Sequence, residues 1–181
     1  HESLFFQLLL GLMSTCLIAS ANYVINEYLD AEFDKFHPLK KNRPSVAGLI
    51  NPVYMIVEYC ILVIFGLGIA WVVGKSFLFF SVLLLIMGVI YNVPPIRLKD
   101  RVFIDVLSES FNNPIRFFLG WHIVEKIYLP PSSILLAYWF GGAFLMAVKR
   151  YAEYKRINDP TCAGLYRRSF RFYSENSLLL S

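Results

Sequence analysis

The sequence predicts a bundle of α-helices that crosses a membrane about five times and forms one domain. Three observations lead to this prediction. Of the 181 residues, 57% are apolar and 17% are charged, whereas a soluble domain usually carries about 25% charged residues. The apolar residues gather in runs close to the roughly 20 residues that a helix needs to cross a membrane. The Lys and Arg residues are concentrated in every second segment between these runs.

Five apolar runs are separated by segments rich in charge, proline or glycine. Each run should form a helix, because the lipid interior offers no hydrogen-bond partner to an unpaired backbone group. The chain begins with His1 rather than Met and ends in what resembles the first turn of another apolar run. We therefore expect a single transmembrane domain over residues 1–181, truncated at both ends. The predicted spans are residues 4–24, 52–73, 77–93, 102–124 and 134–148.

The distribution of the cations predicts the orientation. The three long polar segments, residues 26–52, 94–101 and 149–176, hold all but three of the 17 Lys and Arg residues. Loops rich in Lys and Arg stay in the cytoplasm, so we expect these segments, and the functional site with them, to face the cytoplasm. The net charge of +4 is then explained by membrane orientation, and nucleic acid is not expected as a partner.

A polar face is predicted where the first run ends. Asn22, Asn26, Asp30 and Asp34 are four residues apart, so on a helix of about 3.6 residues per turn they share one side. Oxygen ligands of this kind suit Mg²⁺, which usually completes its coordination with water and substrate phosphates. We predict that Asn26, Asp30 and Asp34 bind magnesium together with a diphosphate. A solvated helix end that carries charges of both signs is the alternative.

The cations that follow this face fit the same chemistry. Lys40, Lys41 and Arg43 come directly after it, and they could neutralise a diphosphate as it leaves. Arg97 and Lys99 stand on either side of one residue, after two prolines, and could cover bound phosphates. Ordinary positive charge in a cytoplasmic loop is the alternative for this second pair.

A second polar face is predicted in the fourth run. Asp105, Glu109 and Asn113 are again four residues apart, and Arg116 follows three residues later. Such side chains must face the bundle interior or a cavity, because exposing each of them to lipid costs several kcal/mol. Two acidic helices beside one basic-rimmed cavity indicate a metal–diphosphate site. The alternative is an internal ion pair, between Glu109 and Arg116 or between Asp105 and a basic loop.

The fifth run ends in a third group of charged residues. Lys149, Arg150 and Glu153 lie within one segment there. Lys149 and Glu153 share a helix face at i and i+4, so they could form an ordered pair beside an anion.

The long form of the first motif resembles the UbiA superfamily of intramembrane prenyltransferases. Its pattern runs from Asn26 to Asp34 and continues with His37-Pro38, Lys41-Asn-Arg43-Pro44 and Gly48. The resemblance extends over Tyr91 to Lys99 and covers nearly the whole chain. It implies an all-helical bundle with more spans than the five predicted here. It also implies magnesium, two acidic motifs and an isoprenoid substrate held in a cavity that opens to lipid.

One departure from that pattern indicates a branch of the superfamily. Members that use aromatic acceptors carry a second aspartate-rich motif where this chain has Lys149-Arg-Tyr-Ala-Glu153. Together with Leu98-Lys99 and Ile104-Asp105, that motif is similar to the decaprenyl-phosphate phosphoribosyltransferase branch. In that branch the diphosphate would belong to phosphoribosyl pyrophosphate, and the attacking group would be the phosphate of a lipid.

We therefore expect a magnesium-dependent transferase that displaces diphosphate and moves a phosphoribosyl group to a polyprenyl phosphate. Transfer of a prenyl group from a prenyl diphosphate to an aromatic or other lipophilic acceptor is the second hypothesis. An ion or proton transporter with an acidic relay is a third, but acids at a basic edge favour phosphate chemistry. The residues expected in catalysis are Asp30, Asp34, Asp105 and Lys149. Those expected to bind substrate are Asn22, Lys41, Arg43, Arg97, Lys99, Glu109, Arg116, Arg150 and Glu153.

Overall fold

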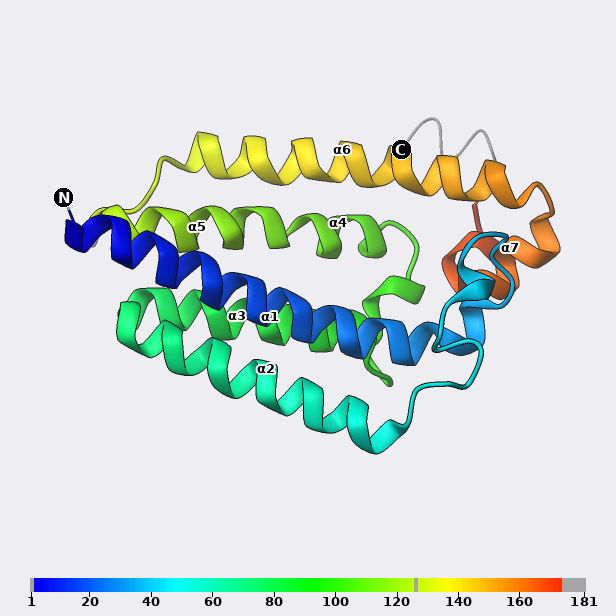
Figure 1. Cartoon of the computed structure of the whole chain (residues 1–181). Coiled ribbons are helices and arrows are strands. Elements are labelled where there is room, and N and C mark those ends of the chain that lie inside the picture. Colours follow the sequence, from blue (N-terminus) through cyan, green and yellow to red (C-terminus); the bar gives the residue numbers. More distant parts are fainter. Residues whose placement is uncertain (1, 126, 174–181) are drawn as a thin grey trace.

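A computed structural model describes residues 2–125 and 127–173, and the secondary structure in these ranges is entirely helical (Figure 1). These ranges contain seven α-helices and three short 3₁₀ helices. The α-helices are α1 (Glu2–Asp34), α2 (Pro52–Val73), α3 (Lys75–Asn92), α4 (Ile104–Ser110), α5 (Asn112–Val124), α6 (Ser132–Ile157) and α7 (Pro160–Tyr166). The 3₁₀ helices are η1 (Lys40–Asn42), η2 (Leu98–Asp100) and η3 (Arg168–Arg171).

Four of the described helices, α1, α2, α3 and α6, are long and apolar enough to cross a membrane. They confirm four of the predicted spans. Two of them continue well past their apolar runs, because α1 extends to Asp34 and α6 to Ile157. A helix of 33 residues such as α1 is about 50 Å long, whereas the hydrocarbon layer is about 30 Å thick. The polar motifs around Asp34 and Glu153 therefore lie on the parts of α1 and α6 that continue past the apolar runs.

The predicted fourth span, residues 102–124, forms two helices placed end to end, α4 and α5 (Figure 1). The helix is interrupted at Phe111, and Pro114 explains part of this, because a proline cannot donate a backbone hydrogen bond to the carbonyl four residues earlier. The carbonyl of Leu107 also accepts side-chain bonds from Ser110, at 3.0 Å, and from the indole of Trp139, at 3.1 Å. The interruption divides the predicted polar face into two parts.

The ends of the other helices follow local signals in the sequence. Asn51 caps α2 by accepting a hydrogen bond from the backbone of Val53 at 2.9 Å, and Pro52 occupies the first turn, where its missing N–H costs nothing. Gly74 separates α2 from α3 with a φ of 153°, a value that side-chain-bearing residues rarely adopt. Asp159 caps α7 in the same way, through the backbone of Thr161 at 2.8 Å.

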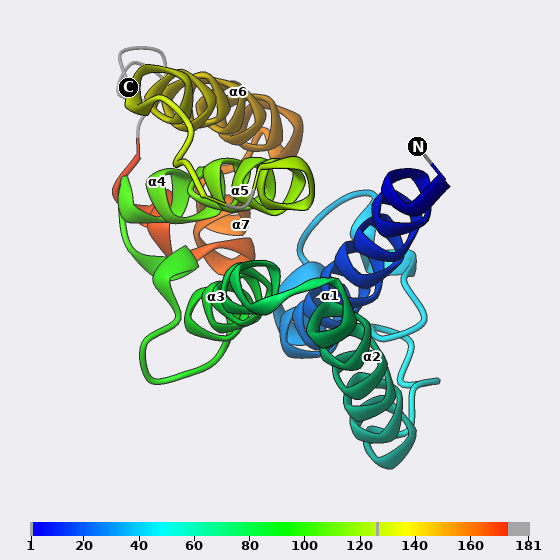
Figure 2. The same cartoon turned by 90° about the vertical axis from the view of Figure 1, so that its left-hand side faces the viewer.

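Small residues bring the first three helices close together. The hydroxyl of Ser14 donates to the carbonyl of Gly66 at 2.7 Å, and a Cβ at Gly66 would lie 2.8 Å from the side chain of Ile18. Close contacts of this kind are typical of helix pairs in membranes. Seen along the bundle, α2 and α6 lie at opposite ends of an arc that α1, α3 and α5 complete (Figure 2). The buried core consists mainly of Ile18, Ala70, Phe77, Leu84, Ile115 and Leu119.

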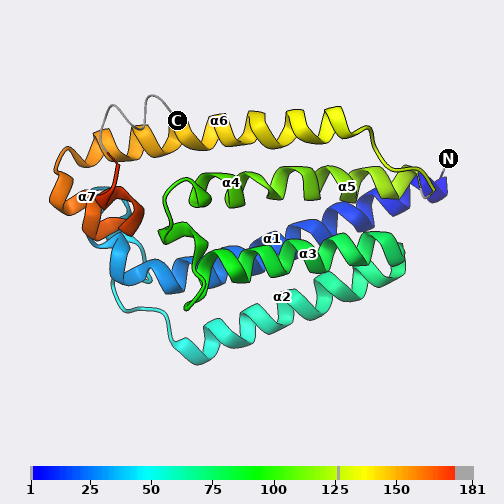
Figure 3. The same ribbon diagram turned by 180° about the vertical axis from the view of Figure 1, so that it is seen from behind.

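The long polar segments gather at one end of the bundle, as predicted. The C-terminal ends of α1, α3 and α6 lie there beside α7 and the connection that follows α1 (Figure 1 and Figure 3). The short α2–α3 and α5–α6 connections lie at the opposite end (Figure 3). That this polar end faces the cytoplasm stays a prediction.

Gly88 of α3 tests the close packing of α1 against α3. A Cβ at this position would lie 2.0 Å from Oδ1 of Asn22, whose amide nitrogen donates to the carbonyl of Leu84 at 3.0 Å. Gly88→Ala should lower the free energy of unfolding by about 1–3 kcal/mol, because the overpacked helices must move apart. Thermal unfolding in detergent micelles measures this. Gly68→Ala in α2, with no atom within 4 Å of the added Cβ, should be neutral or slightly stabilising. Equal losses in the two variants would contradict the expectation.

Candidate active site

The acidic face of α1 is formed as predicted, and each of its carboxylates is paired with a cation. The carboxylate of Asp30 accepts a hydrogen bond from Arg97 at 2.9 Å and forms an ion pair with Lys99 at 2.5 Å. Asp34 is buried and pairs with Arg43 at 2.7 Å. These cations come from the two loops that sequence analysis selected. The predicted phosphate-binding residues therefore meet the predicted metal-binding residues in one place.

Lys99 and Arg97 are buried parts of this site rather than ordinary loop charges. Lys99 is 2% exposed, and its ammonium group also donates to the amide oxygens of Asn26 at 3.3 Å and Asn92 at 2.8 Å. Burial lowers the pKa of Lys99 to about 8, although the carboxylate of Asp30 opposes this shift. The guanidinium of Arg97 stacks on the ring of Phe33, 4.5 Å from its centre.

A second group of ion pairs surrounds Arg150 of α6. This side chain is 1% exposed, and its guanidinium contacts Asp105 at 3.3 Å, Glu109 at 2.6 Å and Glu153 at 3.0 Å. It also donates to the hydroxyl of Tyr91 at 3.0 Å. One cation thus holds three carboxylates from α4 and α6, which makes the loss of that cation costly.

Asp105 is enclosed by further groups from the end of the described chain. It is fully buried and pairs with Arg167 at 3.4 Å, and it accepts hydrogen bonds from the hydroxyls of Ser169 and Tyr173 at 3.5 and 3.3 Å. The alternative of an ion pair between Asp105 and a basic loop is confirmed. A direct catalytic role for Asp105 stays a prediction, and its enclosure favours a positioning role.

Two predicted pairs are wrong. Glu153 does not pair with Lys149 but with Arg150 and, at 3.2 Å, with Lys40. The planar guanidinium of Arg150 reaches it inside the bundle, whereas Lys149 points outward, is 54% exposed and approaches Glu109 only at 3.9 Å. The Glu109–Arg116 pair, which was an alternative for the second polar face, is likewise replaced by Glu109–Arg150.

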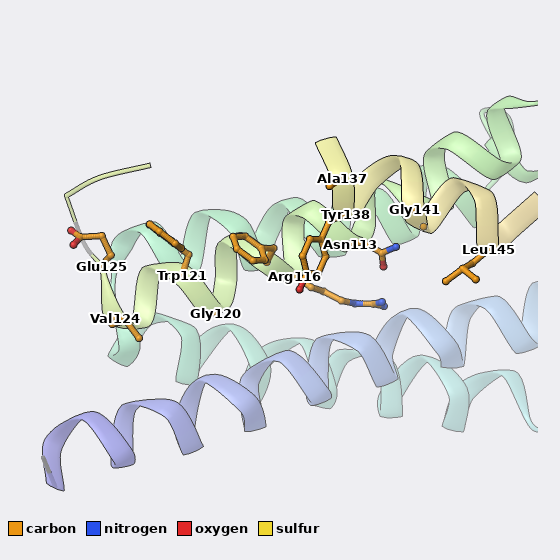
Figure 4. Close-up of a pocket in the computed structure, with 12 residues that line it drawn as sticks. Asn113, Arg116, Gly120, Trp121, Val124, Glu125, Ala137, Tyr138, Gly141 and Leu145 are labelled. Carbon is orange, nitrogen blue, oxygen red and sulfur yellow. The ribbon is translucent and has the colours of Figure 1, made fainter. Parts of the chain in front are cut away.

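Four other predicted residues lie outside the two groups of ion pairs. Asn22 packs against α3, where its amide binds a backbone carbonyl. Lys41 is exposed on η1, and the neighbouring Lys40 takes the inward position. Asn113 and Arg116 lie beyond the interruption at Phe111 and line a cavity between α5 and α6 (Figure 4).

Sequence analysis missed the residue that connects the two groups. The hydroxyl of Tyr91, at the end of α3, donates to Glu109 at 2.7 Å and accepts from Arg150, while its ring lies 6.0 Å from the ammonium group of Lys99. Its signal in the sequence is a Tyr-Asn pair that closes an apolar run, which is weak without the fold. Arg167 was also missed, because only the packing of α7 places it beside Asp105.

The segment after α6 closes the polar end over these groups. Its apolar side chains pack together as Ala163, Tyr166, Phe170 and Tyr173. The hydroxyl of Tyr166 contacts both Lys40 and Glu153, and burial raises the pKa of Tyr166 above its ordinary value. This phenol is therefore protonated at neutral pH and serves as a hydrogen-bonding group.

The donor set on α1 fits magnesium only together with an anion. Among residues 2–125 and 127–173, no cluster of three or more His, Cys, Asp or Glu side chains is arranged to hold a metal alone. The oxygens of Asn26, Asp30 and Asp34 are hard ligands of the kind that Mg²⁺ prefers, but each is paired with a cation. A magnesium diphosphate would supply both missing partners, a metal for the carboxylates and phosphates for the cations.

The sequence model of the UbiA prenyltransferase family matches residues 1–181. The chain belongs to the UbiA prenyltransferase family. With its four helices that are long and apolar enough to cross a membrane, it is an integral membrane protein, and family membership favours the expected transferase over the expected transporter. This classification agrees with the polar motif on α1 and with the helical fold.

Several curated proteins are similar to this UbiA-family chain. It is 32% identical to the decaprenyl-phosphate phosphoribosyltransferase of Mycobacterium tuberculosis over 165 residues, which cover 90% of this chain and 51% of that protein. The enzyme of the same name from Mycolicibacterium smegmatis is 30% identical, with 90% and 49% covered. The protoheme IX farnesyltransferase of Yersinia pseudotuberculosis is 27% identical over 155 residues, with 82% and 52% covered. The chain spans about half the length of these relatives.

Solved structures of a UbiA homolog from Archaeoglobus fulgidus confirm the fold of this UbiA-family chain. The TM-score is 0.82 at 22% identity, and the match covers 96% of this chain and 60% of the other. One of these structures is described as bound to GPP and Mg²⁺ and the other as bound to DMAPP and Mg²⁺.

Arg150 and its neighbour Lys149 provide a matched test of the ion pairs. Arg150→Ala leaves three carboxylates without their shared cation, and we expect a loss of about 3–5 kcal/mol in the free energy of unfolding. Lys149→Ala removes the same charge from an exposed position and should cost about 0–1 kcal/mol. Denaturation in detergent, followed by circular dichroism, compares the two variants. Similar losses in both would show that the group around Arg150 is not a structural centre.

Proposed function

We propose that this chain belongs to a magnesium-dependent enzyme that transfers the phosphoribosyl group of phosphoribosyl pyrophosphate to a polyprenyl phosphate. The polar end of the bundle faces the cytoplasm in this proposal, as the distribution of Lys and Arg indicates. The diphosphate of the donor is held by the face of α1 and by the cations of the two loops beside it.

The observation that carries this proposal is the place of Arg150 within the second acidic group. Asp105, Glu109 and Glu153 all contact this guanidinium, and Arg167 and Lys40 each contact one of the same carboxylates, so three negative charges are matched by three positive ones inside the protein. In the described residues, the carboxylates on the face of α1 are instead paired with cations from two loops, and a metal with a diphosphate can replace these contacts together. The names of the relatives at 30–32% identity support the same branch.

The cations beside α1 suit the departure of a diphosphate. The bond between C1 of the ribose and the diphosphate oxygen loosens, so positive charge develops on the sugar and negative charge on the leaving group. Arg43, Arg97 and Lys99 take up the negative charge. Asn26, Asp30 and Asp34 would hold Mg²⁺, which would supply further positive charge to the leaving diphosphate.

The acceptor in this proposal needs no general base. The phosphate of a polyprenyl phosphate is ionised at neutral pH, so one of its oxygens forms the new bond to C1 directly, and diphosphate leaves. Lys149 remains largely exposed at the rim of the site and is placed to attract this anion. A cationic rim of this kind raises the local concentration of an anionic substrate.

Prenyl transfer from a prenyl diphosphate is the second candidate, and one observation favours it. A cavity of about 1050 Å³ between α5 and α6 has walls that are mostly apolar, which suits an isoprenoid chain. The structural relative bound to GPP and Mg²⁺ supports the same use. The face of α1 would hold the diphosphate in this candidate too, so the two functions differ in the donor.

Labelled donors separate the two functions. Membrane vesicles that contain the protein are supplied with labelled phosphoribosyl pyrophosphate or labelled prenyl diphosphate, with magnesium or with a chelator. We expect phosphoribosyl label in the lipid fraction with magnesium, and only in inverted vesicles, because this donor cannot cross the membrane. Label that enters lipid or another acceptor only from the prenyl diphosphate would overturn the phosphoribosyl assignment.

The acidic face of α1 is tested in the same assay. Asp30→Asn and Asp34→Asn should each lower the rate by at least about 100-fold, because a neutral amide is a poor substitute for a carboxylate on Mg²⁺. Both variants should still insert into the membrane. Glu32→Gln removes an exposed acid from the same helix end and should keep nearly full activity. A rate close to that of the wild type in either aspartate variant would refute the proposed coordination.

A further inference from the structure

The cavity between α5 and α6 holds a charged residue that the site at the polar end does not use. The walls come mainly from apolar side chains, including Phe117, Trp121 and Leu145 (Figure 4). Gly120 of α5 and Gly141 of α6 also line it, and a Cβ added to either glycine would have no atom within 4 Å. These two glycines leave open space along the wall.

Arg116 lies in this wall as a cation for which the described part of the chain offers no partner. Its side chain is exposed to the cavity, and in residues 2–125 and 127–173 no ion pair or hydrogen bond to its guanidinium is found. Figure 4 shows the guanidinium extended along the wall in the direction of Leu145, away from Glu125. An Arg is charged at every accessible pH and carries five donors. Such a group within an apolar wall is costly unless an anion or water binds it, so it is a candidate for ligand binding.

Arg116 lies deeper in the bundle than the second group of ion pairs. It follows Glu109 by seven residues, which corresponds to about 10 Å along the helix axis. The polar groups above it are satisfied by one another, since Asp30 holds Arg97 and Lys99 and Arg150 holds its own three carboxylates. An anion beside Arg116 is therefore a second anion, and the surrounding wall requires that it carry an apolar chain.

We propose that Arg116 binds the phosphate of the polyprenyl phosphate acceptor, while the isoprenoid chain of that lipid lies along Phe117 and Trp121 in the cavity. This inference rests on the proposed function, and it names the residue that selects a phosphorylated lipid. Asn113, one turn before Arg116, is also in the wall, on the side nearer the polar end.

Binding without any donor tests this inference. The purified protein in nanodiscs is titrated with farnesyl phosphate and with farnesol, which share the chain and differ in the phosphate. Arg116→Gln should weaken farnesyl phosphate binding by about 10- to 100-fold, the range expected for charge-assisted hydrogen bonds, and leave farnesol binding unchanged. Arg116→Lys should restore part of the loss. Lys75→Gln, which removes an exposed cation at the start of α3, is the matched control.

The chain-binding part of the cavity is tested with glycine variants. Gly141→Leu fills open space in the wall and should weaken farnesyl phosphate and farnesol equally. Gly68→Leu adds the same side chain to an open position on α2, outside the cavity, and should change neither affinity. Binding of farnesyl phosphate that survives Gly141→Leu would place the chain elsewhere and overturn the inference.

The results also separate this inference from the proposed function. Equal affinities of the wild type and Arg116→Gln for farnesyl phosphate would overturn the inference, even if phosphoribosyl label enters lipid. Loss of farnesol binding in Arg116→Gln would show a packing role only and would also overturn it. Farnesyl phosphate binding that depends on Arg116, in a protein that transfers only prenyl groups, would instead overturn the proposed function.

Discussion

The buried guanidinium of Arg150 is the contact on which the polar end of this protein depends. It joins α3, through Tyr91, to α4, through Asp105 and Glu109, and to its own helix through Glu153. Removing such a cation leaves buried carboxylates uncompensated, which is far more damaging than losing an exposed pair. The buried residues of the short helix α4, Asp105, Ser108 and Ser110, are all polar, so this ionic connection holds it in position.

The same connection orders the rest of the site. Tyr91 lies between Arg150 and Lys99, so the helix end that anchors the second group also supports the lysine that faces Asp30. On the other side, Glu153 connects Arg150 to Lys40, in the loop that follows α1. Buried ion pairs thus fix the positions of the loop after α1 and of the loop that carries Arg97 and Lys99.

The charges on the face of α1 are balanced without any ligand, and this has a consequence for binding. A bare metal would have to displace Arg97, Lys99 or Arg43 from a carboxylate, whereas a bare diphosphate would have to displace a carboxylate from a cation. A metal and a diphosphate that arrive together exchange one balanced set of contacts for another. Charge balance therefore favours a metal-loaded donor and disfavours either part alone.

Four of the five predicted membrane helices, their common polar end and the residues on the face of α1 could be predicted from the sequence, because hydropathy and four-residue spacing depend only on local geometry. The sequence did not determine the partners of the charged residues. Tertiary structure turned Arg150 inward and Lys149 outward, and it interrupted the fourth predicted span at Phe111, so that Arg116 was separated from Glu109. Pairing of this kind depends on which helices pack together, since a buried cation binds the carboxylates that the fold brings within reach and not those nearest in sequence.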